Sequence, residues 1–171
     1  GAVTRQAVLD YVARGGALLF LGRHLPGRES AELAQWLAPI GVHVDIQTLV
    51  EGIYATQNPD PLSRYWDNVR IAGGCGVYAE DPKAVLAAGT GRPDQAVFLA
   101  RSYNLGRVAV LAGPTPLETE ALQAESNRFF AASLFRWLAG AAGTAVQDTD
   151  GDGLADDTED RNRNGVVDPG E

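Results

Sequence analysis

The first part of the chain predicts a helix followed by a buried strand. Thr4 is a suitable N-cap for a helix in which Val8 and Val12 lie at helical spacing. A Gly-Gly pair ends this helix, and the continuous apolar run Ala17–Leu21 follows. Runs that are apolar at every position are typical of strands buried on both faces. We therefore expect a central strand here.

A second unit of the same kind follows. Ser30 can cap a helix that carries Trp36 and Leu37, and the stretch Val42–Val50 then alternates as a strand does. The region 51–68 is rich in Asn, Pro and Asp, and we expect irregular chain there.

The second half adds strands, a hairpin and a last helix. The hairpin joins 96–102 to 107–112 across the turn 103–106, and apolar spacing over 127–138 predicts the helix. Shorter strands are expected at 76–79 and 84–88. Alternating helices and strands favour an α/β fold with three layers, in which helices flank a largely parallel, flavodoxin/amidotransferase-like sheet that includes a β-hairpin.

The last 24 residues follow a different pattern, that of two consecutive twelve-residue calcium loops over 148–159 and 160–171. Calcium takes oxygen ligands from loop positions 1, 3, 5, 7, 9 and 12, with Gly at position 6 for a sharp turn. Both windows meet this rule and predict two bound Ca²⁺ ions. The expected ligands are Asp148, Asp150, Asp152, Leu154, Asp156 and Glu159 in the first loop, and Asp160, Asn162, Asn164, Val166, Asp168 and Glu171 in the second, with Leu154 and Val166 acting through their carbonyl groups.

The two loops follow one another directly, so no helix separates Glu159 from Asp160. An EF-hand needs helices on both sides of each loop, and a dockerin needs a helix after each loop. The helix-free tandem resembles the bacterial thrombospondin type 3 repeat, without the cysteines of the animal form. That resemblance implies a calcium-stabilised connector in a secreted or cell-surface bacterial protein.

Charge divides the chain in the same place. The formal net charge is −8, and residues 148–171 hold nine acidic and two basic residues, a net of −7. The preceding residues are nearly neutral and carry no basic patch, so we expect no nucleic-acid partner. No apolar run is long enough to span a membrane. Loops of this kind bind calcium with dissociation constants of about 10⁻⁴–10⁻³ M, which predicts an extracellular or cell-surface location, with the periplasm as an alternative.

Three stretches of the preceding domain resemble the class I glutamine amidotransferase-like fold, in its ThuA-like, DUF4350-like and intraflagellar-transport-type branch. They are 9–22, 106–113 and 127–138. The resemblance implies one domain over 1–143, a linker over 144–147 and the calcium loops over 148–171. In that family a strand precedes the first helix, so the domain is expected to be a fragment at its N-terminus.

The resemblance also implies where catalytic residues would lie. Active members carry a Cys after the first buried strand and a His after the last strand. Here the first position reads Gly22-Arg23-His24 and the second reads Gly113-Pro114-Thr115, so the catalytic pair is missing. We therefore expect no enzyme, but a non-catalytic binding or structural module that contacts another protein or adjoining domains.

Two other hypotheses stay open. A hydrolase or amidotransferase-like enzyme would use Cys75, the only cysteine, or residues near His24 and Glu118. Cys75 follows two glycines as in a nucleophile elbow, but the next residues favour a strand rather than the required helix, which favours a buried cysteine. A carbohydrate-binding role would use exposed aromatic residues, with Tyr54, Tyr65 and Trp66 as candidates.

Overall fold

The computed structural model describes residues 2–27, 36–56, 62, 66–80, 86–89 and 95–140. Two α-helices, two 3₁₀ turns and six strands have defined bounds in this part of the chain. In chain order these are α1 (Ala2–Ala13), β1 (Ala17–Leu21), η1 (Ala38–Ile40), β2 (Val42–Ala55), β3 (Asn68–Ala79), β4 (Leu86–Gly89), β5 (Gln95–Tyr103), β6 (Gly106–Leu111), η3 (Thr115–Leu117) and α3 (Asn127–Leu138). The calcium loops at 148–171 and the linker at 144–147 lie outside the described residues.

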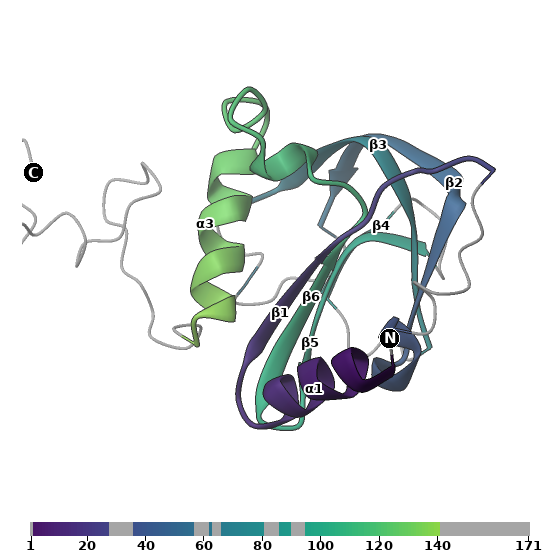
Figure 1. The fold of residues 1–171 in the computed structure, drawn as a ribbon. Helices are drawn as coiled ribbons and strands as arrows, with labels where there is room; N and C mark the ends of the chain where they lie inside the picture. Colours follow the sequence, from purple (N-terminus) through teal and green to yellow (C-terminus); the bar gives the residue numbers. More distant parts are fainter. Residues whose placement is uncertain are drawn as a thin grey trace, which may run out of the picture.

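One curled sheet dominates the fold (Figure 1). Its strand order is β1-β6-β5-β3-β2, and β4 pairs with β5 beside this path. Only β1 and β6 pair in parallel; the other described pairs are antiparallel. The expectation of a three-layer, largely parallel flavodoxin-like sheet is therefore wrong. Two residues separate β5 from β6 and five separate β4 from β5, which is too short for the crossover of about a dozen or more residues that parallel strands need, so these neighbours are antiparallel.

The long antiparallel pair of β2 and β3 is the main departure from the predicted elements. β2 continues to Ala55 and β3 begins at Asn68, so both ends of the region expected to be irregular belong to strands. The register of the pair shifts between Asp45 and Leu49 and again between Val50 and Gly52. Such bulges increase the local twist, and they allow this pair to curl over the rest of the sheet.

Several predicted elements are confirmed. β1 has the predicted bounds, and α3 covers the predicted residues. The β5–β6 hairpin turns between Tyr103 and Gly106, where Asn104 takes a left-handed conformation with φ of 52°. The helix expected from Ser30 lies mostly outside the described residues, but Trp36 and Leu37 are helical and lead into η1.

The sheet is covered by α1 and α3 on different sides (Figure 1). On the α3 side, the rings of Trp66, Phe98 and Phe130 meet edge to face, with centroid separations of 4.9 to 6.1 Å. On the α1 side, an added Cβ at Gly106 would meet the carbonyl oxygens of Val12 and Gly16. The glycine therefore lets α1 approach the sheet closely.

Candidate functional site

Two of the residues that the sequence singled out, His24 and Cys75, lie where the chain that leaves β1 passes β6 and β3. The chain leaving β1 continues the sheet for a few residues: Gly22 N–H donates to Leu111 O at 2.7 Å, and His24 N–H donates to Gly73 O at 2.9 Å. Leu25 N–H then donates to Ile46 O of β2 at 2.9 Å. The segment after β1 thus crosses from β6 to β3 and β2, and it places His24 beside the bulge of β2.

Cys75 lies at the centre of this crossing and is fully buried. Its N–H donates to Ala112 O at 2.8 Å, and its sulfur fills the space that a side chain at Gly22 would need. Burial raises the pKa of the thiol to about 11. A hydrogen bond from the backbone of Arg23 lowers the pKa, but by less than burial raises it. A thiol with this pKa is almost entirely protonated at neutral pH, and the thiolate is the nucleophilic form.

The nucleophile-elbow geometry is absent at Cys75. An elbow places the nucleophile on a sharp turn between a strand and a helix. Cys75 instead lies inside β3, which continues to Ala79. The interpretation of Cys75 as a buried cysteine is confirmed. Cys75 therefore lacks the geometry and the exposure that the hypothesis of an enzyme with a nucleophile at this position requires.

Asp45 is the polar residue of this region that the sequence reading missed. Thr48 Oγ1 donates to Asp45 Oδ2 at 2.6 Å, and Gln47 N–H donates to Oδ1 at 2.9 Å. These hydrogen bonds, that of Thr48 first, lower the pKa of Asp45, and the nearby His24 side chain acts in the same direction. The Asp-x-x-Thr spacing that forms this turn is visible in the sequence, but its position at a bulge is not.

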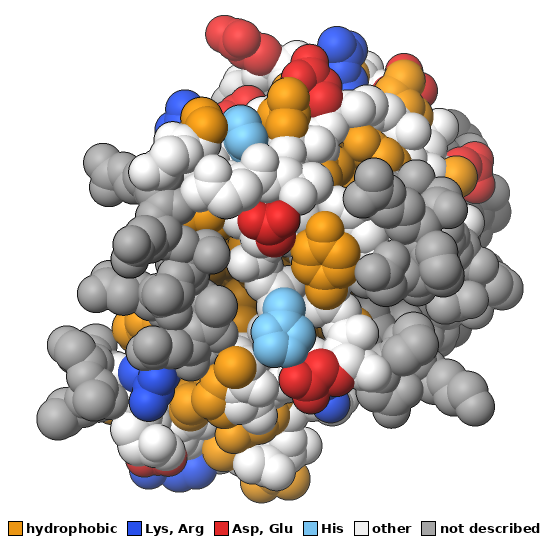
Figure 2. All heavy atoms as spheres, turned by 90° about the vertical axis from the view of Figure 1, so that its right-hand side faces the viewer, with side chains coloured by type: hydrophobic (Ala, Val, Ile, Leu, Met, Phe, Trp, Pro, Cys, Tyr) orange, Lys and Arg blue, Asp and Glu red, His pale blue; other side chains and the backbone are white. Residues whose placement is uncertain are grey.

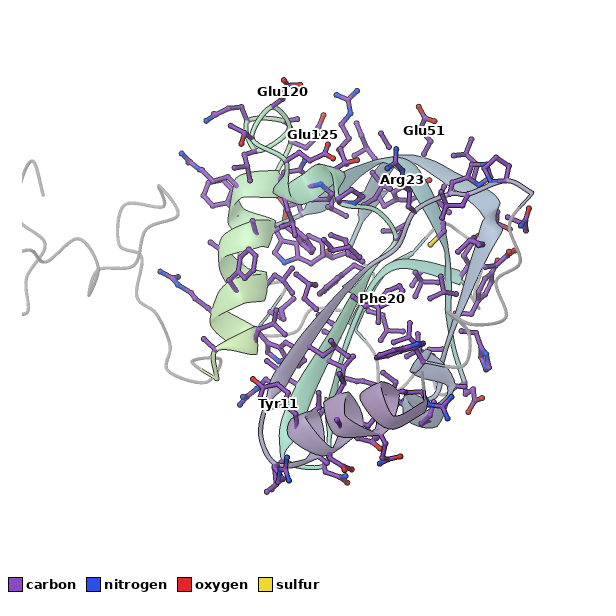
Figure 3. The ribbon with its side chains drawn as sticks, in the orientation of Figure 1. Tyr11, Phe20, Arg23, Glu51, Glu120 and Glu125 are labelled. Atoms are coloured by element: carbon purple, nitrogen blue, oxygen red, sulfur yellow. The ribbon has the colours of Figure 1, made fainter. Side chains whose placement is uncertain are left out.

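His24 is half-buried, and its Nδ1 atom is enclosed without a hydrogen-bond partner among the described residues. No hydrogen bond or ion pair joins His24 to Cys75 or to Glu118 in the described part of the chain. Glu118 follows η3 and is exposed. Figure 3 shows Glu120 in the loop above α3 and Arg23 just after the end of β1. The loop that carries Glu118 and the segment that carries His24 are therefore separate features at the same end of the molecule.

His43 lies on β2 with its side chain turned away from the buried Val42 and Val44, as the alternation predicts. Its Nε2 lies 2.9 Å from Glu80 Oε1, and both side chains are about half exposed. Figure 2 shows the two histidines of the chain on one face, with a carboxylate beside the lower one. An exposed pair of this kind contributes roughly 0–1 kcal/mol to the free energy of unfolding.

The aromatic candidates for carbohydrate binding fall in different environments. Trp66 is buried in the aromatic cluster, and its Nε1–H donates to Leu62 O at 2.8 Å. Tyr54 is half-buried, and its hydroxyl donates to Glu51 O at 2.9 Å. Tyr65 lies outside the described residues. Trp66 therefore packs the core and cannot stack on a sugar at the surface.

Metal ligands do not gather in the described part of the chain, where no group of three His, Cys, Asp or Glu side chains is placed to hold an ion. The twelve expected calcium ligands all lie outside it. No helix in the same part is long and apolar enough to cross a membrane.

No family model matches the sequence, and no curated protein sequence matches it. Among solved structures, the N-terminal domain of mmIFT52 aligns with a TM-score of 0.65 and 20% identity, over 81% of this chain and 71% of that one. STM1381, a cytoplasmic protein from Salmonella typhimurium LT2, aligns with a TM-score of 0.61 and 19% identity, over 79% of this chain and 60% of its own. A mannosidase from an Opitutaceae bacterium, Op5Man5, reaches a TM-score of only 0.38 at 15% identity, over 86% of this chain and 24% of its own.

These findings correct the resemblances drawn from the sequence. The class I glutamine amidotransferase-like assignment and the thrombospondin type 3 assignment are wrong: no family model supports either, and the sheet is mostly antiparallel. At these identities, the likeness to mmIFT52 and STM1381 shows a shared fold.

Proposed function

We propose that this chain is a non-catalytic protein-interaction module with a calcium-binding C-terminal segment. The buried thiol of Cys75 is the observation that carries the non-catalytic part. Nucleophilic catalysis needs a thiolate within hydrogen-bond reach of a base and of substrate. Cys75 is closed off from solvent, and its burial disfavours the thiolate.

The surface of β2 supports a role in protein contacts. Leu49 and Ile53 are 54% and 56% exposed, and the exposed Glu51 lies between them along the strand. Apolar side chains beside a charged rim are typical of contacts between proteins. The first two structural neighbours include a domain of a larger protein, which is consistent with a module that works beside other domains.

The calcium part of the proposal depends on the order of residues in 148–171. Oxygen-bearing side chains stand at positions 1, 3, 5, 9 and 12 of both windows, with Gly153 and Gly165 at position 6. Two bound ions would offset four of the seven net negative charges of this segment. Because such loops bind weakly, the proposal places the protein outside the cell or at its surface, where calcium is abundant.

Isothermal titration of the full chain with calcium tests this part. Asp150→Ala removes a ligand at position 3 of the first loop, and Asn162→Ala removes the equivalent ligand of the second. Each substitution should abolish one binding event, and the double variant should abolish both. The matched control is Asp157→Ala, which removes the same charge from position 10, where no ligand is expected.

Unchanged binding heats in the double variant would exclude the loops as the calcium site. An equal loss of binding in Asp157→Ala and Asp150→Ala would show that net charge, rather than ligand geometry, attracts the ion. Bound calcium should also protect residues 148–171 from proteolysis, and this protection should disappear in chelator.

A further inference from the structure

The two calcium loops of the proposed function differ in the charge of their ligands at two positions. Positions 3 and 5 are Asp150 and Asp152 in the first loop, but Asn162 and Asn164 in the second. Positions 1, 9 and 12 hold Asp, Asp and Glu in both loops, and Gly stands at position 6 of both. The first loop therefore offers five carboxylates to an ion, and the second offers three.

Charges at positions that are not expected to ligate the ion widen this difference. The second loop carries Arg161 and Arg163 at positions 2 and 4, whereas the first has no basic residue and carries Asp157 at position 10. Six acidic residues give 148–159 a net charge of −6, and three acidic and two basic residues give 160–171 a net charge of −1. The preceding 147 residues hold 13 acidic and 12 basic residues, so their net charge does not offset the difference.

Electrostatics then ranks the two loops. A carboxylate oxygen attracts a divalent cation more strongly than the oxygen of a neutral amide does, and the number of charged ligands is one of the properties that set the dissociation constant of a calcium loop. The positively charged Arg161 and Arg163 repel the ion from the second loop. One ion bound in the first loop changes its net charge from −6 to −4, and this reduces the attraction that the neighbouring loop gains from it.

We propose that the loops fill in order, the first at low calcium and the second at a calcium concentration about tenfold or more higher. This inference rests on the proposed function, because it requires that both loops bind calcium. Loops of this kind have dissociation constants of about 10⁻⁴–10⁻³ M. The second loop is then the site that responds when calcium changes within the millimolar range, while the first stays occupied.

An NMR titration of the full chain with calcium chloride, in about 0.15 M salt, tests the order. The backbone amide signals of Gly153 and Gly165 report the first and the second loop separately, since each is the glycine at position 6 of its own loop. The signal of Gly153 should complete its shift first. The calcium concentration at half-shift should be about tenfold or more higher for Gly165.

Exchanging the ligands tests the cause. The double substitution Asn162→Asp and Asn164→Asp gives the second loop the carboxylates of the first, and it should lower the half-shift concentration of Gly165 by about tenfold. The half-shift concentration of Gly153 should change by less than about twofold in this variant, because the ligands of the first loop are untouched. An unchanged midpoint for Gly165 would overturn the assignment of the order to ligand charge.

The matched pair Asp152→Asn and Asp157→Asn separates ligand charge from net charge within the first loop. Both remove one negative charge, but only position 5 is an expected ligand position. Asp152→Asn should raise the half-shift concentration of Gly153 by severalfold, and Asp157→Asn should raise it by less than about twofold. Equal effects of the two substitutions would overturn the role of ligand charge.

The parent titration also separates this inference from the function on which it rests. Simultaneous shifts of Gly153 and Gly165, or an earlier shift of Gly165, would overturn the order while leaving two calcium loops in place. No calcium-dependent shift of either signal would overturn both the order and the proposed calcium binding.

Discussion

Gly22 and Cys75 share one space: the sulfur of Cys75 lies where the Cβ of any other residue at position 22 would have to be. The carbonyl oxygen of Ala112 lies 2.8 Å from the same point. The chain after β1 can cross from β6 to β3 only because position 22 has no side chain. This contact fixes both the path of the segment that carries His24 and the burial of the thiol.

Gly22→Ala should destabilise the protein by about 1–3 kcal/mol, because overpacking displaces neighbouring atoms. The same substitution should cost less in a Cys75→Ala background, where the sulfur is gone. Urea unfolding of the two single variants and the double variant gives the coupling energy between the two positions. Strict additivity would show that Ala112 O, and not the sulfur, causes the clash.

The Cys75 thiol should resist alkylation in the native protein at pH 8 and react rapidly in urea. The folded pKa of about 11 lies above the ordinary value of 9.0, so the folded state holds the thiol proton more tightly than the unfolded state does. Stability from this source is complete below about pH 9 and is lost as the pH rises towards 11. Urea unfolding of the parent chain and Cys75→Ala between pH 8 and 11 should show the parent losing stability faster. Parallel curves would contradict the raised pKa.

Asn127 joins the start of α3 to the open side of β3. Its Oδ1 accepts a hydrogen bond from Arg70 N–H at 3.0 Å, its Nδ2 donates to Ala121 O at 2.9 Å, and the side chain is fully buried. Asn127→Ala should lower the free energy of unfolding by about 1–3 kcal/mol, because it removes the side-chain acceptor of Arg70 N–H and one of the two donors to Ala121 O, which keeps its hydrogen bond from Ala124 N–H. The control is Asn68→Ala. In the parent chain, Asn68 Oδ1 accepts a longer hydrogen bond, of 3.4 Å, from Ser126 N–H. An equal loss of unfolding free energy in the two variants would show that the buried hydrogen bonds of Asn127 stabilise the fold no more than the longer one of Asn68.

Thr48→Val should raise the pKa of Asp45, because the hydroxyl of Thr48 is the main group that lowers it. A lowered carboxyl pKa stabilises the folded state above the unfolded pKa of about 4, and this contribution is lost as the pH falls through the folded pKa. The variant should therefore show a weaker dependence of stability on acid pH. Carbon-detected NMR titration measures the pKa directly. Gln47→Ala keeps the backbone donor and should leave the pKa of Asp45 unchanged.

Local patterns located most elements but not their arrangement. The helical spacing of Val8 and Val12 and the apolar run Ala17–Leu21 are properties of neighbouring residues, and α1 and β1 follow them. The hairpin turn at Asn104 was predictable for the same reason. The bulge that exposes Asp45 to Thr48 and His24 depends on pairing with β3, and no local pattern encodes that pairing.

The sequence by itself predicted β1, the β5–β6 hairpin and α3, a buried cysteine at position 75, and the spacing of calcium ligands over 148–171. Tertiary structure decided that the described sheet is mostly antiparallel and that β1 pairs in parallel with β6. An apolar run such as Ala17–Leu21 indicates that both faces of the strand favour burial. In the structure, α1 and α3 cover the sheet on different sides. The apolar run does not record which strand lies beside it, because strand partners are chosen by contacts between residues far apart in the chain.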